Sequence, residues 1–257
     1  MAELPASVRV ALWVTHAWTE GAAVADAIHT ALPDIDHTEG LIDQVRLWRD
    51  LGEAALLVAL PGPGDTTGLP GCGPIATDAA VQAGEALFVP GLGGLLVPAH
   101  STYGSEGARG HRIDWMAHDA DPVPVHRIEA LEASQLERHL RRRMIAAVEE
   151  LDAIGGHPWS ADVAHDLLDD RLGRDWALPP GLSDRSRRVI GLAATLSVAA
   201  SLGMESSGAL SAAHDLTRSR ALRTLHRDAE RTLADATNSA CASLAGWAPT
   251  RCARCEP

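Results

Sequence analysis

The segment 61–74 constrains the fold of this chain more than any other part of the sequence. Five of its residues are glycine and four are proline, and no helix or strand survives at that density. The continuous apolar run 54–60 precedes it and predicts an interior strand. Pro74 can occupy the first position of a helix, which we expect over 75–87. The sequence therefore predicts a strand, a long irregular loop and a helix in succession.

The rest of the first half carries shorter apolar runs bounded by turn residues. The run 8–14 is rich in β-branched residues and predicts a buried strand. The other elements expected here are two helices, over 20–32 and 39–51, and two strands, over 94–99 and 112–117. Because the glycine-rich segment 103–110 separates the two strands, we expect them to form a hairpin with a long loop.

Beyond residue 125 the apolar residues recur at helical spacing. Helices are expected over 134–154, 160–172, 183–202 and 206–242. The fold class is therefore α/β or α+β, with a small mixed β-sheet in the N-terminal half packed with a helical C-terminal half of about four helices.

The expected division of the chain follows the same boundary. We expect an acidic α/β half over 1–125, a helical half over 126–248 and a flexible tail over 249–257. The alternative is one continuous domain over 1–248, in which the helices cover the sheet.

Charge excludes several kinds of function. All 22 basic residues are arginine, which indicates a GC-rich, bacterial genome and excludes Schiff-base chemistry, a lysine general base and a P-loop lysine. The net charge is −12, of which residues 1–125 contribute −11 and residues 126–257 contribute −1. Because an acidic surface repels phosphate backbones, nucleic acid is not an expected partner.

Cysteine usage and hydropathy indicate a cytoplasmic protein. Four cysteines are too few for a disulfide scaffold at this length, and residues 1–18 lack the features of a signal peptide. The longest apolar stretch, 189–200, is too short to span a bilayer, so no membrane association is expected. Cys252 and Cys255 form a C-x-x-C pair near the last residue; this is half a zinc ligand set, and we expect a silent tail.

The loop 61–74 is the first candidate ligand site. Its backbone N–H groups are accessible at glycines, and a helix N-terminus is expected after Pro74, so the loop favours a small anion or another small ligand. The candidate ligand-binding residues are Asp65, Thr66, Thr67, Gly71, Cys72 and Gly73, together with His16 and His100 at expected strand ends. The alternative is a proline-stiffened connector, in which Asp65 bonds its own backbone.

Cys72 also raises the possibility of nucleophilic catalysis. A thiol at a helix N-terminus is favoured as thiolate, and His16 or His100 could act as its base. The alternative is an inert, buried cysteine.

The helical half contains a second candidate set. His139, the pair His165-Asp166 and then Asp215 or Asp228 follow one another along expected helices, and this order resembles the metal-ligand order of the HD-domain metal phosphohydrolases. The resemblance implies a metal-dependent phosphohydrolase. The alternative is that His165 and Asp166, with neighbouring Asp162 and Asp169, form the solvated face of their helix.

Four arginines recur along one side of the last expected helix, at positions 220, 223, 227 and 231. Such a stripe can hold an anion, an acidic partner or RNA, or it can dock on the acidic first half of its own chain. The alternative is a solvated face interleaved with acids.

Taken together, these observations predict a soluble cytoplasmic protein that acts through protein or small-ligand contacts, without catalysis and without a metal or cofactor. The alternatives are the phosphohydrolase and a nucleotide-binding or anion-binding protein that uses the loop 61–74.

Overall fold

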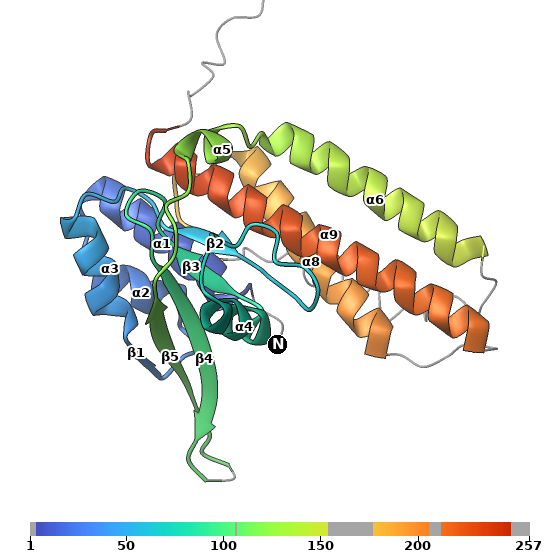
Figure 1. Ribbon diagram of the computed structural model, residues 1–257, viewed down its shortest axis with the longest axis horizontal. Helices are drawn as coiled ribbons and strands as arrows, with labels where there is room; N and C mark the ends of the chain where they lie inside the picture. Colours follow the sequence, from blue (N-terminus) through green and yellow to red (C-terminus); the bar gives the residue numbers. More distant parts are fainter. Residues whose placement is uncertain (1–3, 106, 154–176, 206–211, 248–257) are drawn as a thin grey trace, which may run out of the picture.

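The computed structural model describes residues 4–105, 107–153, 177–205 and 212–247 (Figure 1). Five strands form one mixed sheet in the N-terminal half, and long helices make up the C-terminal half, so the fold class is α+β. The helices are α1 (Ala6–Glu20), α2 (Val24–Ala31), α3 (Leu41–Asp50), α4 (Pro74–Ala83), α5 (Val125–Glu129), α6 (Ala133–Ala153), α8 (Asp184–Glu205) and α9 (Ala212–Leu244). The strands are β1 (His37–Glu39), β2 (Leu57–Ala59), β3 (Ala86–Phe88), β4 (Leu95–Tyr103) and β5 (Gly110–His118).

The strand predicted over 8–14 is wrong, because these residues form the middle of α1. Ten of its fifteen residues are buried, on all sides of the helix. A helix without a polar face lacks the 3.6-residue periodicity that separates it from a buried strand, and its valines favoured the wrong choice. Gly21, in the left-handed conformation at φ +68°, ends α1. The Thr19 hydroxyl donates to the Thr15 carbonyl inside α1.

The sheet has the strand order β1-β5-β4-β3-β2. The strands predicted over 54–60, 94–99 and 112–117 are confirmed as β2, β4 and β5, and the last two form the expected hairpin, which projects from the body of the molecule (Figure 1). β1 pairs in parallel with β5, whereas the other pairs are antiparallel. β3 was predicted as the end of a helix over 75–87, but Gly84 adopts φ +73° and ends α4 before it.

In the second half, α6, α8 and α9 confirm three of the four predicted long helices. α8 begins at Asp184, one residue after the expected start at Ser183, and the Ser183 hydroxyl accepts the Ser186 N–H at 3.1 Å. The short helix α5 was not predicted. The helix predicted over 160–172 lies outside the described residues.

α8 is the only helix in the described part of the chain that is long and apolar enough to cross a membrane. It is longer than the apolar stretch seen in the sequence, because it extends to Asp184 and Glu205. Its buried residues Val189, Ile190 and Ala193 belong to the same hydrophobic core as the sheet. A core helix of a soluble protein meets the same criteria of length and composition, so α8 does not by itself indicate a membrane protein.

The edge of the sheet at β2 is covered by α9. The Asn238 Oδ1 accepts the Val58 N–H at 2.7 Å, and the Asn238 Nδ2 donates to the Val58 carbonyl at 2.9 Å. Both partners are buried. The side-chain amide thus takes the place of a neighbouring strand on the outer side of β2, where an unpaired buried backbone would be costly.

We predict that Asn238→Ala lowers the free energy of unfolding by about 2–4 kcal/mol, because it leaves the buried N–H and carbonyl of Val58 without partners. Denaturant unfolding measures the change. Ser243→Ala, at an exposed position on the same helix, is the control and should change stability little. Equal stability of the Asn238 variant and wild type would contradict the assigned role.

Candidate functional site

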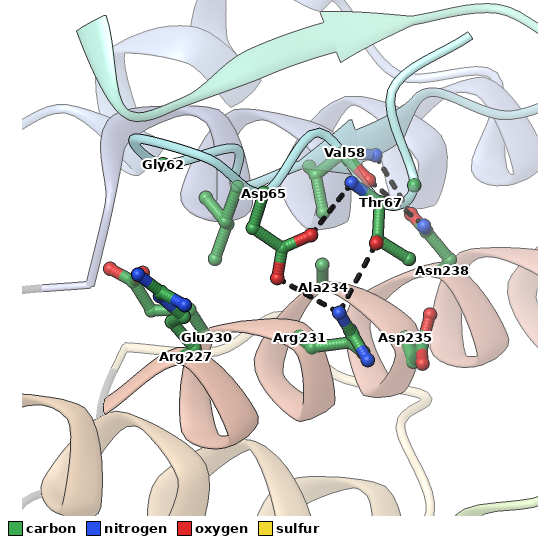
Figure 2. Close-up of a pocket in the computed structure, with 12 residues that line it drawn as sticks. Val58, Gly62, Asp65, Thr67, Arg227, Glu230, Arg231, Ala234, Asp235 and Asn238 are labelled. Carbon is green, nitrogen blue, oxygen red and sulfur yellow. Dashed lines mark hydrogen bonds and ion pairs between the residues drawn. The ribbon is translucent and has the colours of Figure 1, made fainter. Parts of the chain in front are cut away.

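A small cleft lies where the loop after β2 meets the exposed side of α9 (Figure 2). We call it the α9 cleft; its volume is about 30 Å³. It is lined by Val58, Leu60, Gly62, Asp65, Thr67, Gly68, Arg227, Glu230, Arg231, Ala234, Asp235 and Asn238. Polar and charged side chains therefore meet over an apolar floor at the junction of the two halves of the chain.

The wall formed by the loop is fixed by its own backbone. Gly62 and Asp65 exchange two backbone hydrogen bonds, of 2.8 and 2.9 Å, around Pro63 and Gly64. Gly64 has φ +77°, which the third residue of this kind of turn requires. The Asp65 Oδ1 then accepts the Thr67 N–H at 3.0 Å, as predicted for the connector alternative. The turn thereby leaves the other carboxylate oxygen of Asp65 to face α9 (Figure 2).

Arg231 joins the loop to the helix. Its Nη2 donates to the Asp65 Oδ2 at 2.8 Å and to the Thr67 hydroxyl at 3.1 Å. The Thr67 hydroxyl, followed by weaker contributions that include Arg231, holds the pKa of Asp65 below its ordinary value. Arg231 of the arginine stripe therefore contacts the acidic first half of its own chain, which is one of the alternatives given for that stripe.

Arg227 lies one turn before Arg231 and, unlike Arg231, is not bonded to the loop. It is exposed, and it makes no hydrogen bond or ion pair with the residues that the structure describes. The neighbouring carboxylate of Glu230 pairs instead with the Nε2 of His226, at 3.2 Å. The hydrogen bond to Glu230 raises the pKa of His226.

Asp235 lies one turn after Arg231 and completes the row of charges along α9. Burial raises its pKa to about 6, and Arg231 opposes this only in part. No N–H or O–H group in the described part of the chain donates a hydrogen bond to this carboxyl. A half-buried carboxyl in a cleft, with its pKa near neutrality, marks a candidate functional residue.

The structure divides the predicted loop site into two parts. Asp65 and Thr67 line the α9 cleft, whereas Thr66 is exposed and its carbonyl accepts the Leu69 N–H. Gly71 and Cys72 do not line the cleft and run alongside residues 120–121, where the Gly71 carbonyl accepts the Asp121 N–H at 2.6 Å.

Gly73 precedes α4, as expected, and its carbonyl accepts the Thr77 N–H at 3.0 Å. The Cys72 Sγ lies 3.3 Å from the Thr77 hydroxyl, so its partner is the first turn of α4. Gly73 does not line the α9 cleft, and neither predicted histidine base hydrogen-bonds to Cys72.

His16 and His100 lie away from the cleft. His16 belongs to α1 and not to a strand end, because the strand prediction for this segment was wrong; its ring lies edge-on to Trp13, with centroids 6.3 Å apart. The His100 Nε2 lies 2.8 Å from the Oε1 of buried Glu85. The second oxygen of Glu85 accepts the Ser7 N–H in the first turn of α1 at 2.7 Å, so this pair ties β4 to the start of α1.

The residues that carry the HD-domain resemblance are not brought together where they are described. His139 is exposed on α6 and Asp215 is exposed near the start of α9. Arg143 of α6 pairs with Asp228 of α9, and the two helices run in opposite directions (Figure 1). At about 1.5 Å of rise per residue, this pairing places His139 and Asp215 about 25 Å apart along the helices.

His165 and Asp166 lie outside the described residues, as do Cys252 and Cys255. Within the part of the chain that the structure describes, no group of three His, Cys, Asp or Glu side chains could hold a metal ion. The phosphohydrolase therefore stays a prediction.

Sequence analysis missed the part of the cleft that comes from the end of α9. Asp235 and Asn238 follow Arg231 at spacings of four and seven residues, and this spacing places all three on one side of a helix. Extending the arginine stripe to polar residues of any kind would have found them.

The fold and the cleft define an α+β protein with a polar cleft between its two halves. Residues 7–129 match the family model of Rv1486c-like protein, N-terminal domain, and residues 134–234 match that of Rv1486c-like protein, C-terminal domain. Together the two matches cover most of the chain, and the N-terminal model precedes the C-terminal model along it. The chain therefore belongs to the Rv1486c-like protein family. The chain matches no curated protein and no solved structure. The loop wall of the cleft falls in the first matched region, and the α9 wall falls in the second as far as Ala234, whereas Asp235 and Asn238 follow it.

The pair formed by His100 and Glu85 predicts a pH dependence of stability. The hydrogen bond to Glu85 raises the folded-state pKa of His100 above its ordinary 6.5. The pair therefore stabilises the fold fully below about pH 6.5 and loses this contribution as the pH rises through the higher folded-state pKa. The difference in melting temperature between wild type and His100→Ala should shrink over that interval. His111→Ala, at an exposed position on β5, is the control; a difference that grows with pH would contradict the assignment.

Proposed function

We propose that this is a cytoplasmic binding protein that holds a small oxyanion, free or as part of a larger molecule, in the α9 cleft. The observation that supports this proposal is the state of the two arginines that line the cleft. Arg231 is held in a fixed orientation by Asp65 and Thr67, and Arg227, one turn away, has no partner among the described residues. Two guanidinium groups on one face of a helix, one of them preoriented, suit a phosphate or sulfate group.

The carboxylates that line the cleft do not cancel its preference for a phosphate or sulfate group. Asp65 is neutralised by Arg231, and Glu230 is paired with His226. Burial raises the pKa of Asp235 to about 6, so this carboxyl is largely uncharged only below that pH. Among the described residues Arg227 is the lining cation that has no hydrogen bond or ion pair, and it is the natural partner of an anion.

The size of the cleft limits the bound group. A cavity of about 30 Å³ is too small for a whole nucleotide, since pockets that enclose molecules of that size are roughly ten times larger. It suits one oxyanion group whose remainder, if any, extends into solvent. Inorganic anions should therefore bind on their own. A nucleotide-binding site, in contrast, would require the nucleoside part of its ligand.

We predict that inorganic phosphate and sulfate raise the melting temperature of the wild-type protein and that Arg227→Gln removes most of this shift, because the substitution removes the unpaired cation. Arg223→Gln is the matched control: it loses the same charge one turn earlier on α9, outside the cleft, and should keep the shift. Loss of the shift in both variants would indicate a general charge effect, and no shift in wild type would refute the proposal.

A further inference from the structure

We propose that an oxyanion enters the α9 cleft together with one proton, which resides on Asp235, so that binding is coupled to pH. This inference rests on the proposed function and adds its regulation. A neutral Asp235 carboxyl can donate its O–H to an oxygen of the anion, whereas a charged one repels the anion.

The first argument is that Arg231 is oriented toward the opposite wall and forms no ion pair with Asp235. The Nη2 of Arg231 is committed to Asp65 and Thr67 on the opposite wall (Figure 2). To swing toward Asp235 it would lose both hydrogen bonds. The loop after β2 therefore keeps Arg231 as part of an anion site, and Asp235 forms no ion pair with any residue that the structure describes.

The second argument is that no other lining residue serves Asp235. On α9, Glu230 is paired with His226, and the amide of Asn238 is used by Val58. β2 and the residue after it offer only the apolar side chains of Val58 and Leu60, and the loop offers the carboxylate of Asp65, which is itself acidic. The remaining cation, Arg227, lies two turns away on α9.

The sign of the coupling follows from these charges. Burial already raises the pKa of Asp235 to about 6, and a bound anion next to it raises this pKa further. Anion affinity should therefore be highest below about pH 6 and should fall roughly tenfold for each pH unit above it, which is the limit for one linked proton.

The test is isothermal calorimetry of the full chain with sulfate, whose charge is constant between about pH 5 and pH 8. Chloride keeps the ionic strength constant. Repeating the titration in buffers of different ionisation enthalpy measures how many protons the protein takes up when sulfate binds. This measurement needs only the wild-type protein. We expect an uptake approaching one proton above pH 6 and an affinity at least tenfold lower at pH 8 than at pH 5.5.

Asp235→Asn should bind sulfate with little dependence on pH, because the amide keeps a donor and cannot ionise. Asp152→Asn, at an exposed position on α6, should keep the wild-type dependence. His226 is the competing titrating group: if the dependence survives in Asp235→Asn and disappears in His226→Gln, the assignment to Asp235 is overturned. Sulfate binding that is tight and independent of pH would overturn this inference alone, whereas no binding at any pH would overturn the proposed function with it.

Discussion

The structure depends on how α9 is seated against the edge of the sheet. β2 is an edge strand of three residues, and its outer side would leave backbone groups unpaired in the interior. Asn238 pairs with both backbone groups of Val58, and the Thr15 hydroxyl accepts the N–H of Leu56 just before the strand. A side-chain amide from one half and a hydroxyl from the other thus replace the missing neighbouring strand and fix the position of both helices.

The cleft is a consequence of that seating. With Asn238 held at Val58, the preceding turns of α9 pass beside the residues that leave β2, and the glycine-rich and proline-rich segment begins there. Its first turn presents Asp65 to Arg231, which joins the loop to the helix. The Asp65–Arg231 ion pair has Arg227 on one side and Asp235 on the other, and neither side chain forms a hydrogen bond or an ion pair with the residues that the structure describes. One structural ion pair therefore creates both the cation and the protonatable carboxyl that the proposed function uses.

The sequence predicts those parts of this fold that local chemistry determines. Glycine and proline define the loop 61–74, and the periodicity of α6 and α9 is clear because one side of each helix is polar. The segment 8–14 was misread because α1 is buried on all sides. β1 has three residues and exists through its pairing with β5, a contact that no local pattern encodes.

The candidate site shows the same division. Asp65 and Thr67 were predicted because they belong to an unusual loop, and Arg227 and Arg231 because they form a stripe. Asp235 and Asn238 lie on the same helix but look like ordinary surface residues in the sequence. Their burial is set by β2, which is about 180 residues earlier in the chain, so only the folded structure identifies them.

The most direct test of this account is a crystal structure of the wild-type protein grown near pH 5.5 with selenate, whose selenium can be located by anomalous scattering. The account predicts selenate in the α9 cleft against the Arg231 guanidinium, with an oxygen within hydrogen-bond distance of the Asp235 carboxyl and the Arg227 side chain turned toward it. An empty cleft in crystals that hold selenate elsewhere, or an Arg231 side chain turned away from Asp65 to pair with Asp235, would contradict it.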